Sequence, residues 1–372
     1  MGYRFGDETK RQEEKLKAYY LNGGRKAIGI DVASPNVMVV SSGDDHIPTG
    51  TAIDPDVTFD DFVGQDRAKE LVLLNIQAWE RDPDNVPGHM LFTGPGGVGK
   101  STIANAVANR MGTKFITTAP HHLRAPAQIF EFFFNPDFSP KIQQGDIIFI
   151  DEVHGFDMRM AAFMYNVLQD FVLDYKLNQP LIYDGDRYSS GDVVRLKIPK
   201  FLCVGATTDA GMMHPPLRDR FINRMEFDLY SPEEIAEIVS RYRVMGSLAA
   251  MEIAKRSAGN PRKAKALTRL SHLVSNRMGR DTVYPEDVLA ACDLFGIDEK
   301  GLDKNAQRVV EFFVKTGNKP AGTPPIAAST GIYRTTLEGE TFKAMAYAGV
   351  LVFTSRGKHL SPEYYQEVVN GK

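Results

Sequence analysis

Two short stretches of the chain carry residues that could bind and cleave a phosphate group. The first is glycine-rich and ends in Lys-Ser-Thr: Gly94-Pro95-Gly96-Gly97-Val98-Gly99-Lys100-Ser101-Thr102. Its glycines allow a tight curl in which several backbone N–H groups converge on phosphate oxygens. This is the spacing of a P-loop, in which Lys100 reaches the β- and γ-phosphates of ATP and the Ser101 hydroxyl holds Mg²⁺.

The second stretch ends in two adjacent carboxylates, Asp151 and Glu152, which follow the apolar run of residues 147–150. Such a run is typical of a buried central strand, and ligands bind beyond the carboxyl ends of strands in open α/β sheets. Asp151 could hold Mg²⁺, directly or through water, and Glu152 could polarise the water that attacks the γ-phosphorus. Two acids after a strand are more often surface residues, but the P-loop upstream favours catalysis.

The elements around these stretches alternate between strand and helix. Apolar runs at residues 89–93, 114–118, 146–150 and 201–206 predict strands, and helices are expected after Gln65 and over residues 103–111. Alternation of this kind indicates a parallel sheet with helices on both faces. We therefore predict an α/β nucleotide-binding domain, with the helix after the P-loop pointing its N-terminus at the phosphates.

Length and composition set limits on the remaining functions. A chain of 372 residues has room for several domains, and its formal net charge of −3 means that any contact with nucleic acid depends on a local patch. Cys203 and Cys292 stand far apart in apolar contexts, which predicts buried thiols. We find no signal peptide and no apolar run of membrane-spanning length, so the expected location is the cytoplasm and no membrane partner is expected.

Two arginines, Arg218 and Arg220, lie in a short segment before another apolar strand. Arginines in such a place usually form surface ion pairs. In a ring of ATPase subunits, however, the segment can face a neighbour's phosphates and supply an arginine in trans. By contrast, the spacing of His121, His122 and Asp137 matches no metal motif, which favours solvated or capping roles.

The second half of the chain has a different pattern. An all-helical region is expected from Ser231 and Pro232, an N-cap and a first-turn proline, to about Ile297. Within it, residues 253–280 contain eight basic side chains and no acid, which fits a phosphate-facing surface or a solvated helix face. Residues 298–372 read as three helices and a hairpin with its turn at 355–358, a winged-helix order that serves either DNA binding or protein docking.

Residues 1–54 carry the least information. A short amphipathic helix is expected over residues 8–21, strands within 27–40 and a loop from 41 to 55. A partner-binding arm and a packing extension are equally compatible with this pattern.

Together these motifs resemble the AAA+ ATPases, and more narrowly the bacterial RuvB family of hexameric Holliday-junction branch-migration motors. The resemblance covers roughly residues 55–372. It rests on the P-loop and on the following segments: Phe62-Val63-Gly64-Gln65, Phe149-Ile150-Asp151-Glu152-Val153-His154, Gly205-Ala206-Thr207-Thr208, Pro216-Leu217-Arg218-Asp219-Arg220-Phe221, Gly259-Asn260-Pro261-Arg262 and Arg356-Gly357-Lys358.

The resemblance implies a domain order and a set of partners. An N-terminal extension at 1–54 would precede an α/β AAA+ core with a parallel sheet and P-loop at 55–228, an all-α lid at 229–297 and a C-terminal winged-helix domain at 298–372 that binds DNA. The cofactors would be ATP and Mg²⁺, the assembly a homo-oligomeric ring, a hexamer in the family, and the substrate duplex or four-way-junction DNA.

The resemblance also implies roles for single residues. Thr207 or Thr208 would be the polar sensor that orients the attacking water, and Arg218, or else Arg220, the arginine finger. Arg262 would be the lid arginine that reports the γ-phosphate. Residues Phe62 and Val63 would line the adenine pocket, and Arg356 and Lys358 would touch the DNA backbone.

Three features depart from the family pattern. Asp209 stands where the family commonly has an arginine, the extension at 1–54 is foreign to it, and residues 174–194, which correspond to the hairpin that docks the junction-binding partner RuvA, mix apolar and charged side chains. Two other functions therefore stay open beside the junction motor. One is an AAA+ clamp or helicase loader that acts on a protein partner at DNA, and the other is a nucleotide-gated binding module with little turnover.

Overall fold

The computed structural model describes residues 37–39, 58–82 and 88–371. The chain divides into two units, residues 1–37 and 38–372, and the description below concerns the second, apart from the first residue of strand β1. The helix predicted over 8–21 and the loop predicted over 41–55 lie outside the described residues. Of the strands expected within 27–40, the described part is β1 (Val37–Val39).

A six-stranded sheet forms the centre of the nucleotide-binding half, with strand order β1-β3-β4-β9-β2-β10. The strands that follow β1 in this order are β3 (Phe115–Thr118), β4 (Ile147–Ile150), β9 (Leu202–Thr207), β2 (Met90–Thr93) and β10 (Asn223–Glu226). Each pair from β3 to β10 is parallel, with Thr93 opposite Thr207 and Thr118 opposite Ile150. The loops after β2, β4 and β9 therefore emerge at one edge of the sheet, as the sequence predicts.

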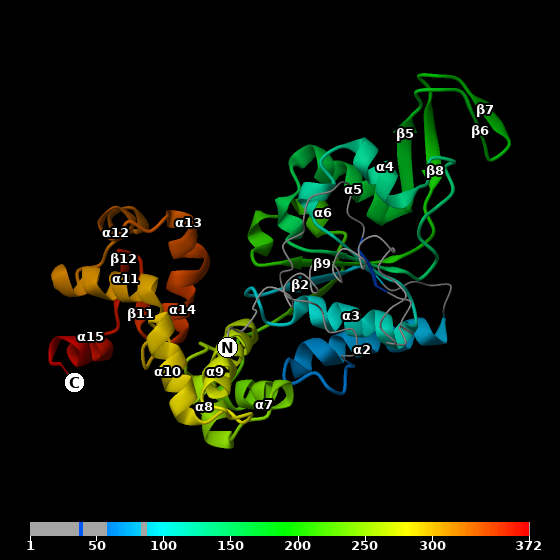
Figure 1. Cartoon of the computed structure of the whole chain (residues 1–372). Coiled ribbons are helices and arrows are strands. Elements are labelled where there is room, and N and C mark those ends of the chain that lie inside the picture. The colour runs from blue at the N-terminus through cyan, green and yellow to red at the C-terminus, as the bar shows by residue number, and fades with distance from the viewer. Residues whose placement is uncertain (1–36, 40–57, 83–87, 372) are drawn as a thin grey trace, which may run out of the picture. The chain divides into compact units, whose positions relative to one another are not determined.

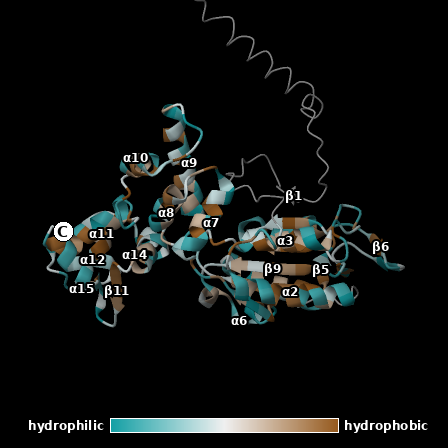
Figure 2. Cartoon of the chain, turned by 90° about the horizontal axis from the view of Figure 1, so that it is seen from below, coloured by the Kyte–Doolittle hydropathy of each residue, from teal (hydrophilic) through white to brown (hydrophobic). Residues whose placement is uncertain are grey.

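Helices cover both faces of this sheet because successive side chains of each strand point to opposite sides. Phe92 and Val204 join one apolar cluster with α2 (Asp66–Arg81) and α3 (Lys100–Met111). Leu91 and Cys203 join a second cluster with α4 (Pro126–Phe133), α5 (Met158–Asp170) and α6 (Pro215–Arg218). Figure 1 shows the sheet between these two helix layers, and in Figure 2 the ribbons of α2 and α3 carry both hydrophobic and hydrophilic residues.

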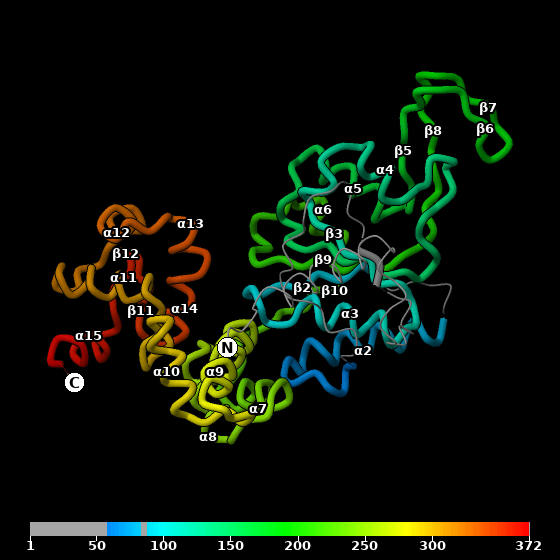
Figure 3. The backbone as a smooth tube through the Cα atoms, viewed as in Figure 1, coloured from blue at the N-terminus to red at the C-terminus, as the bar shows by residue number. Residues whose placement is uncertain are grey.

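A double hairpin extends from the sheet domain. Strands β5 (Val172–Lys176) and β8 (Val193–Lys197) pair antiparallel and lead into a second hairpin of β6 (Leu181–Tyr183) and β7 (Asp186–Tyr188). The backbone can be followed outward along β5 and back along β8 in Figure 3. Between β5 and β8, Arg195 Nε and Nη2 donate to the two carboxylate oxygens of Asp174, at 2.8 and 3.0 Å.

Four helices follow the sheet: α7 (Pro232–Tyr242), α8 (Ser247–Lys255), α9 (Pro261–Arg277) and α10 (Pro285–Phe295). Helix α7 begins as predicted, because the Ser231 hydroxyl accepts from Glu234 N and the Glu234 carboxylate accepts from Ser231 N. Arg256 and Arg280, both in the acid-free stretch 253–280, pair with Glu252 and Asp287 outside it. Arg256 therefore pairs within the last turn of α8, Arg280 joins the end of α9 to α10, and both are engaged in ion pairs.

The C-terminal elements have their own apolar cluster, built from residues between Leu302 and Leu360. They are α11 (Lys304–Lys315), α12 (Thr323–Thr330), the short α13 (Arg334–Thr336), which continues through a π-helical turn at Leu337–Thr341 into α14 (Phe342–Tyr347), the hairpin of β11 (Leu351–Thr354) and β12 (Gly357–Leu360), and α15 (Pro362–Val369).

The predicted order of helices and hairpin is present in this part, with two differences. The turn is shorter than expected, because Gly357 already pairs with Thr354 and Lys358 lies inside β12. Helix α15 was not predicted, although Ser361 and Pro362 are a usual way to begin a helix. No described helix of the chain is long and apolar enough to cross a membrane.

The buried His89 stabilises the amino end of β2 through two hydrogen bonds to the backbone. Its Nε2 lies 2.9 Å from the Leu168 carbonyl and its Nδ1 accepts from Cys203 N at 3.0 Å, while its ring stacks on Phe201. Burial lowers the pKa of His89 from 6.5 to about 4. The folded state therefore keeps this ring neutral, with both nitrogens bonded to the backbone.

His89 should make the protein acid-sensitive. The pKa of His89 is lower in the folded than in the unfolded state, so between pH 6.5 and 4 the unfolded chain binds a proton that the folded chain does not. The free energy of unfolding therefore has its full value above pH 6.5 and falls as the pH drops below 6.5. The fall amounts to about 3 kcal/mol in the free energy of unfolding. In urea unfolding curves measured across this range, His89→Gln should be less stable at pH 7 and lack this part of the slope. The partly exposed His359→Gln should keep it, and an unchanged slope in His89→Gln would contradict the assignment.

Candidate nucleotide site

The P-loop, residues 94–99, leads from β2 into α3 with Lys100 as the first helical residue. The Lys100 ammonium donates to the carbonyl oxygens of Gly94 and Pro95, at 2.7 and 2.8 Å, which holds it over the loop. Burial lowers the pKa of Lys100, and the negative charges of Glu152 and Asp151 oppose that shift. Ser101 and Thr102 lie half-buried in the first turn of α3, beside the N-terminus that carries its unpaired N–H groups.

Helix α9 begins directly on this loop. Gly97 has a φ of +85°, and a Cβ there would lie 2.7 Å from Asn260 Oδ1 and 2.8 Å from Arg262 Cβ. Asn260 Nδ2 donates to the Gly96 carbonyl at 2.8 Å, while its Oδ1 caps α9 by accepting from Arg262 N at 2.9 Å. Arg262 is thereby brought to the phosphate-binding loop from 165 residues away in sequence, counted from Gly97.

A tyrosine from the start of the helical region closes the other side of the loop. Tyr230 is 2% exposed, and its hydroxyl donates to the Val98 carbonyl at 3.0 Å. Phe62 packs here as well, since a Cβ on Gly99 would lie 2.7 Å from its ring. Val63 is partly buried next to Phe62. The sequence did not identify Tyr230 or Asn260 as site residues. Tyr230 directly precedes Ser231, the N-cap of α7, and Asn260 is itself the N-cap of α9.

The two carboxylates stand at the end of β4. Asp151 has an exposed surface, yet its pKa is raised, first by desolvation of the carboxyl and then by the neighbouring charge of Glu152. Glu152 has a φ of +49°, a left-handed conformation that costs roughly 1 kcal/mol for a residue with a side chain. The strained turn bends the Glu152 carboxylate back toward the end of β9.

Three polar groups hold the Glu152 carboxylate there. Thr208 donates to it from its backbone N at 3.1 Å and from its hydroxyl at 3.2 Å, and His154 Nδ1 lies 3.2 Å away. His154 Nδ1 also lies 2.8 Å from the hydroxyl of the fully buried Thr207, which accepts from Asp209 N. Of the two predicted sensors, Thr208 is thus the one that contacts Glu152 directly. Thr207 contacts His154, to which the sequence had given no role.

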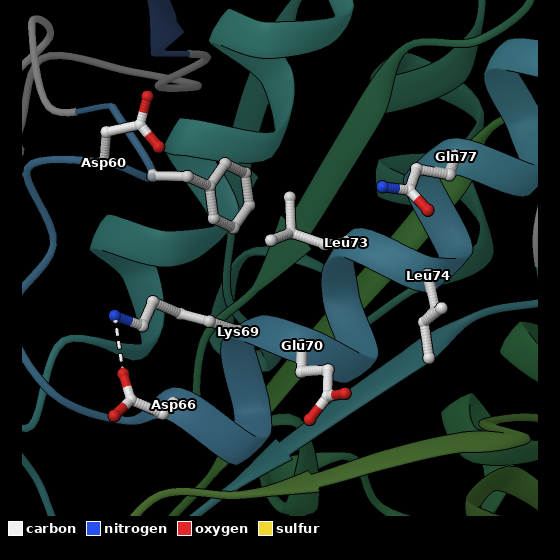
Figure 4. A pocket seen from close by; sticks show the side chains of 8 residues that line it. Asp60, Asp66, Lys69, Glu70, Leu73, Leu74 and Gln77 are labelled. Carbon is white, nitrogen blue, oxygen red and sulfur yellow. Dashed lines mark ion pairs between the residues drawn. The ribbon is translucent and has the colours of Figure 1, made fainter.

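Water can reach these acids from a pocket of about 400 Å³. Asp151 and Glu152 form part of its wall, together with His121, Arg124 and Asp157 from the neighbouring loops. A second, larger pocket of about 490 Å³ lies along α2, where Figure 4 shows the Lys69–Asp66 ion pair and the exposed Leu74. Neither pocket is lined by P-loop residues, but only the smaller one is lined by the two carboxylates after β4.

The predicted Mg²⁺ ligands, Ser101 and Asp151, flank the P-loop lysine from α3 and from β4. A hydroxyl and a carboxylate are hard oxygen donors, which suit Mg²⁺ when phosphate and water complete its shell. The raised pKa of Asp151 fits the same role, since a cation would offset the charge of Glu152. Within the described residues no cluster of three or more His, Cys, Asp or Glu could hold a metal by itself. Ser101 and Asp151 therefore fit a Mg²⁺ ion whose other ligands are phosphate oxygens and water.

The two candidate arginine fingers have different surroundings. Arg220 is held in its own subunit, since it donates to Gln169 and to the Tyr165 hydroxyl and lies 4.2 Å from the Tyr165 ring centroid. Arg218 ends α6. Among the described residues the Nε of both arginines is buried without a hydrogen-bond partner, but only Arg220 has its terminal guanidinium nitrogens hydrogen-bonded within the chain. Arg218 is therefore the more available of the two.

The remaining predicted residues lie outside this site. Arg356 is exposed in the β11–β12 turn, whereas the Lys358 ammonium donates to the Thr323 hydroxyl at 3.0 Å and lies over the Phe342 ring. Cys203 and Cys292 are free and buried, as predicted. Asp137 caps its own turn by accepting from Ser139, which agrees with the capping role expected for it.

These features define a P-loop ATPase of the AAA+ type. They are a P-loop on a parallel sheet, paired carboxylates after β4, hydroxyls after β9 and a helix that contacts the loop. A family model described as "Holliday junction DNA helicase RuvB P-loop domain" matches residues 54–227. The P-loop domain therefore matches the RuvB family model, and the similarity to RuvB proteins extends well beyond this domain.

The similarity to known proteins covers most of the chain. It is 29% identical over 313 residues to a "Holliday junction branch migration complex subunit RuvB" from Nitratiruptor, covering 83% of this chain and 89% of that protein. Its structure is similar to the Thermotoga maritima RuvB Holliday junction branch migration motor, with a TM-score of 0.70, 28% identity and coverage of 84% and 97% of the two chains. A mutant of that RuvB superposes with a TM-score of 0.71.

The site predicts a separation of binding from hydrolysis in Glu152→Gln. The amide keeps the size of the side chain but cannot take a proton from water, so ATP turnover should fall by roughly 10²- to 10⁴-fold while ATP affinity is kept. Phosphate release and equilibrium binding of a fluorescent ATP analogue measure the two quantities. The exposed Glu70→Gln on α2 serves as the matched control. Loss of both quantities together would show that Glu152 supports the fold of the loop instead.

Proposed function

We propose that the chain is a cytoplasmic, ATP-driven ring motor that moves duplex DNA and branch-migrates four-way junctions. The observation that carries the proposal is the contact of Thr208 with Glu152 beside the P-loop, a water-activating arrangement, in a chain that is RuvB-like over more than four fifths of its length. The RuvB relatives are named for Holliday-junction branch migration, which points to the DNA substrate.

The hydrolytic step uses residues that surround the loop. Lys100 and the backbone N–H groups of the P-loop bind the β- and γ-phosphates, and Arg262 reaches the same phosphates from α9. Glu152 takes a proton from water as the water oxygen bonds to the γ-phosphorus, and the bond from that phosphorus to the β–γ bridging oxygen breaks, which leaves ADP. Thr208 orients the Glu152 carboxylate. Ser101 and Asp151 would hold Mg²⁺, which neutralises phosphate charge when bound.

Ring assembly explains the position of Arg218. With Arg220 held by α5, Arg218 is the side chain that we propose reaches a neighbour's γ-phosphate, an arrangement worth roughly 10³- to 10⁵-fold in rate in related systems. Residues 229–297 are proposed to act as a lid whose closing brings Arg262 to the nucleotide. Each hydrolysis event then changes the lid of one subunit and the interface to the next, most simply in a hexamer.

DNA and a docking partner are assigned to two separate surfaces. We propose that residues 298–372 are a winged-helix domain in which exposed Arg356 at the hairpin turn contacts the phosphate backbone. Lys358 supports this hairpin through Thr323. The double hairpin over residues 174–194 exposes Ile182 and Val193, at 67% and 60%, and is proposed to dock a junction-binding protein.

Strand exchange on a synthetic four-way junction with labelled arms tests the proposed function. With ATP and Mg²⁺, the full chain should convert the junction into duplex products, because hydrolysis drives the DNA through the ring. Glu152→Gln should give no product while still binding the junction. Active ATP hydrolysis without any ATP-dependent product, with the junction-binding partner also supplied, would contradict the proposal and favour a loader that acts on protein.

A further inference from the structure

His154 lies in a one-turn helix, η2 (Val153–Gly155), which directly follows the two carboxylates. Its Nδ1 lies 2.8 Å from the Thr207 hydroxyl and 3.2 Å from the Glu152 carboxylate. The His154 side chain is 20% exposed, and Thr207 is fully buried. One ring nitrogen therefore links the proposed base after β4 to the end of β9.

The turn that carries His154 is held in place by its neighbours. Val153 is 1% exposed and packs against β9, where a Cβ on Gly205 would lie 3.2 Å from Val153 Cγ1. Gly155 N donates to the Glu152 carbonyl at 2.8 Å, which closes the turn. The imidazole thus projects from a backbone that has little freedom to move.

The neighbours of Nδ1 determine which ring nitrogen carries the proton. An ionised carboxylate can only accept hydrogen bonds, so an unprotonated Nδ1 at 3.2 Å from Glu152 would bring two lone pairs together. A proton on Nδ1 removes this repulsion and lets the N–H point at both Glu152 and the Thr207 oxygen. The Thr207 oxygen also accepts from Asp209 N at 3.0 Å. The contacts therefore favour the Nδ1–H form of His154, with Thr207 fixing the ring.

Glu152 depends on such donors because packing does not hold its carboxylate. The Glu152 side chain is 46% exposed, and its backbone has the left-handed φ of +49°. Thr208, after β9, donates to the carboxylate from its backbone N and its hydroxyl, at 3.1 and 3.2 Å. His154 supplies a further donor from the β4 side. Donors on two separate loops fix the orientation of the carboxylate better than donors on one.

We propose that His154 is a positioning residue for ATP hydrolysis, whose Nδ1–H holds the Glu152 carboxylate in the orientation in which it takes a proton from the attacking water. This inference rests on the proposed function, because it takes Glu152 as the base. The proton of the water goes to Glu152 and His154 keeps its own, so the imidazole acts through orientation alone. Loss of this donor slows the chemical step and leaves ATP affinity intact.

Steady-state phosphate release by the full chain, with Mg²⁺ and without DNA, tests the assignment. His154→Leu should lower kcat by roughly 10- to 100-fold, the effect of a lost hydrogen bond to a charged group and a shift of about 1 Å in the base. KM for ATP and the Kd of a fluorescent ATP analogue should stay unchanged. The partly exposed His359→Leu in β12 is the matched control and should keep kcat.

Two polar variants locate the donor on the ring. His154→Asn should recover most of the activity, because its amide nitrogen can take the place of Nδ1. His154→Gln should not, because its amide reaches the place of Nε2. An unchanged kcat in His154→Leu would overturn the proposal, and so would equal rates in the Asn and Gln variants. If urea unfolding shows that the Leu variant is unstable, the comparison of Asn with Gln decides.

A double-mutant cycle with Glu152→Gln tests whether His154 acts through the carboxylate. Single-turnover hydrolysis is measured in the natural chain, in His154→Leu, in Glu152→Gln and in the double variant. If His154 positions the base, His154→Leu should cause no further loss once Glu152 has been replaced. Losses that multiply would show an independent role of His154 in the fold of the site and would overturn the proposal.

Failure of this inference can be told from failure of the proposed function. If the variants at position 154 hydrolyse ATP like the natural chain while Glu152→Gln is inactive and the natural chain exchanges strands, only the role of His154 is wrong. If the natural chain hydrolyses no ATP, the proposed function is wrong. If Glu152→Gln hydrolyses ATP at the natural rate, Glu152 is not the base and the role of His154 falls with it.

Discussion

The contact between the P-loop and the start of α9 is the constraint on which the rest of the site depends. Gly97 has no room for a Cβ because Asn260 and Arg262 lie against it, and Asn260 caps its helix with one end of its amide and holds Gly96 with the other. The P-loop is thereby joined to the first turn of a helix that lies 165 residues further along the chain, counted from Gly97 to Arg262.

Charge distribution explains why so many parts of the chain meet here. Lys100 is buried with two carboxylates nearby, and each of these groups would be costly to desolvate alone. The positive charge of Arg262 at the start of α9 and the negative charges of Asp151 and Glu152 act on this lysine with opposite effects on its pKa. A nucleotide with its metal ion would bring anionic phosphates to the lysine and a cation to the carboxylates, which offsets both kinds of charge.

The sequence was sufficient to predict the parts of the site whose residues lie close together along the chain. The P-loop, the acids after β4 and the Ser231 cap follow from neighbouring residues, and the structure has them where they were expected. The partners of Glu152 and of the loop could not be predicted in the same way. His154 meets Thr207 across 53 residues and Tyr347 meets Tyr230 across 117, pairings that only the tertiary fold determines. The difference between Arg218 and Arg220 likewise depends on Tyr165, a contact absent from any motif.

The central claim is that the hydrolytic site is completed by a neighbouring subunit, and a mixing measurement tests it most directly. Glu152→Gln lacks the base and Arg218→Ala lacks the finger, so each variant alone should hydrolyse ATP poorly. When the two are combined and allowed to exchange subunits, some interfaces pair an intact Glu152 with a neighbour's intact Arg218. The account predicts phosphate release well above the sum of the separate preparations, and a mixture that stays at that sum would contradict it.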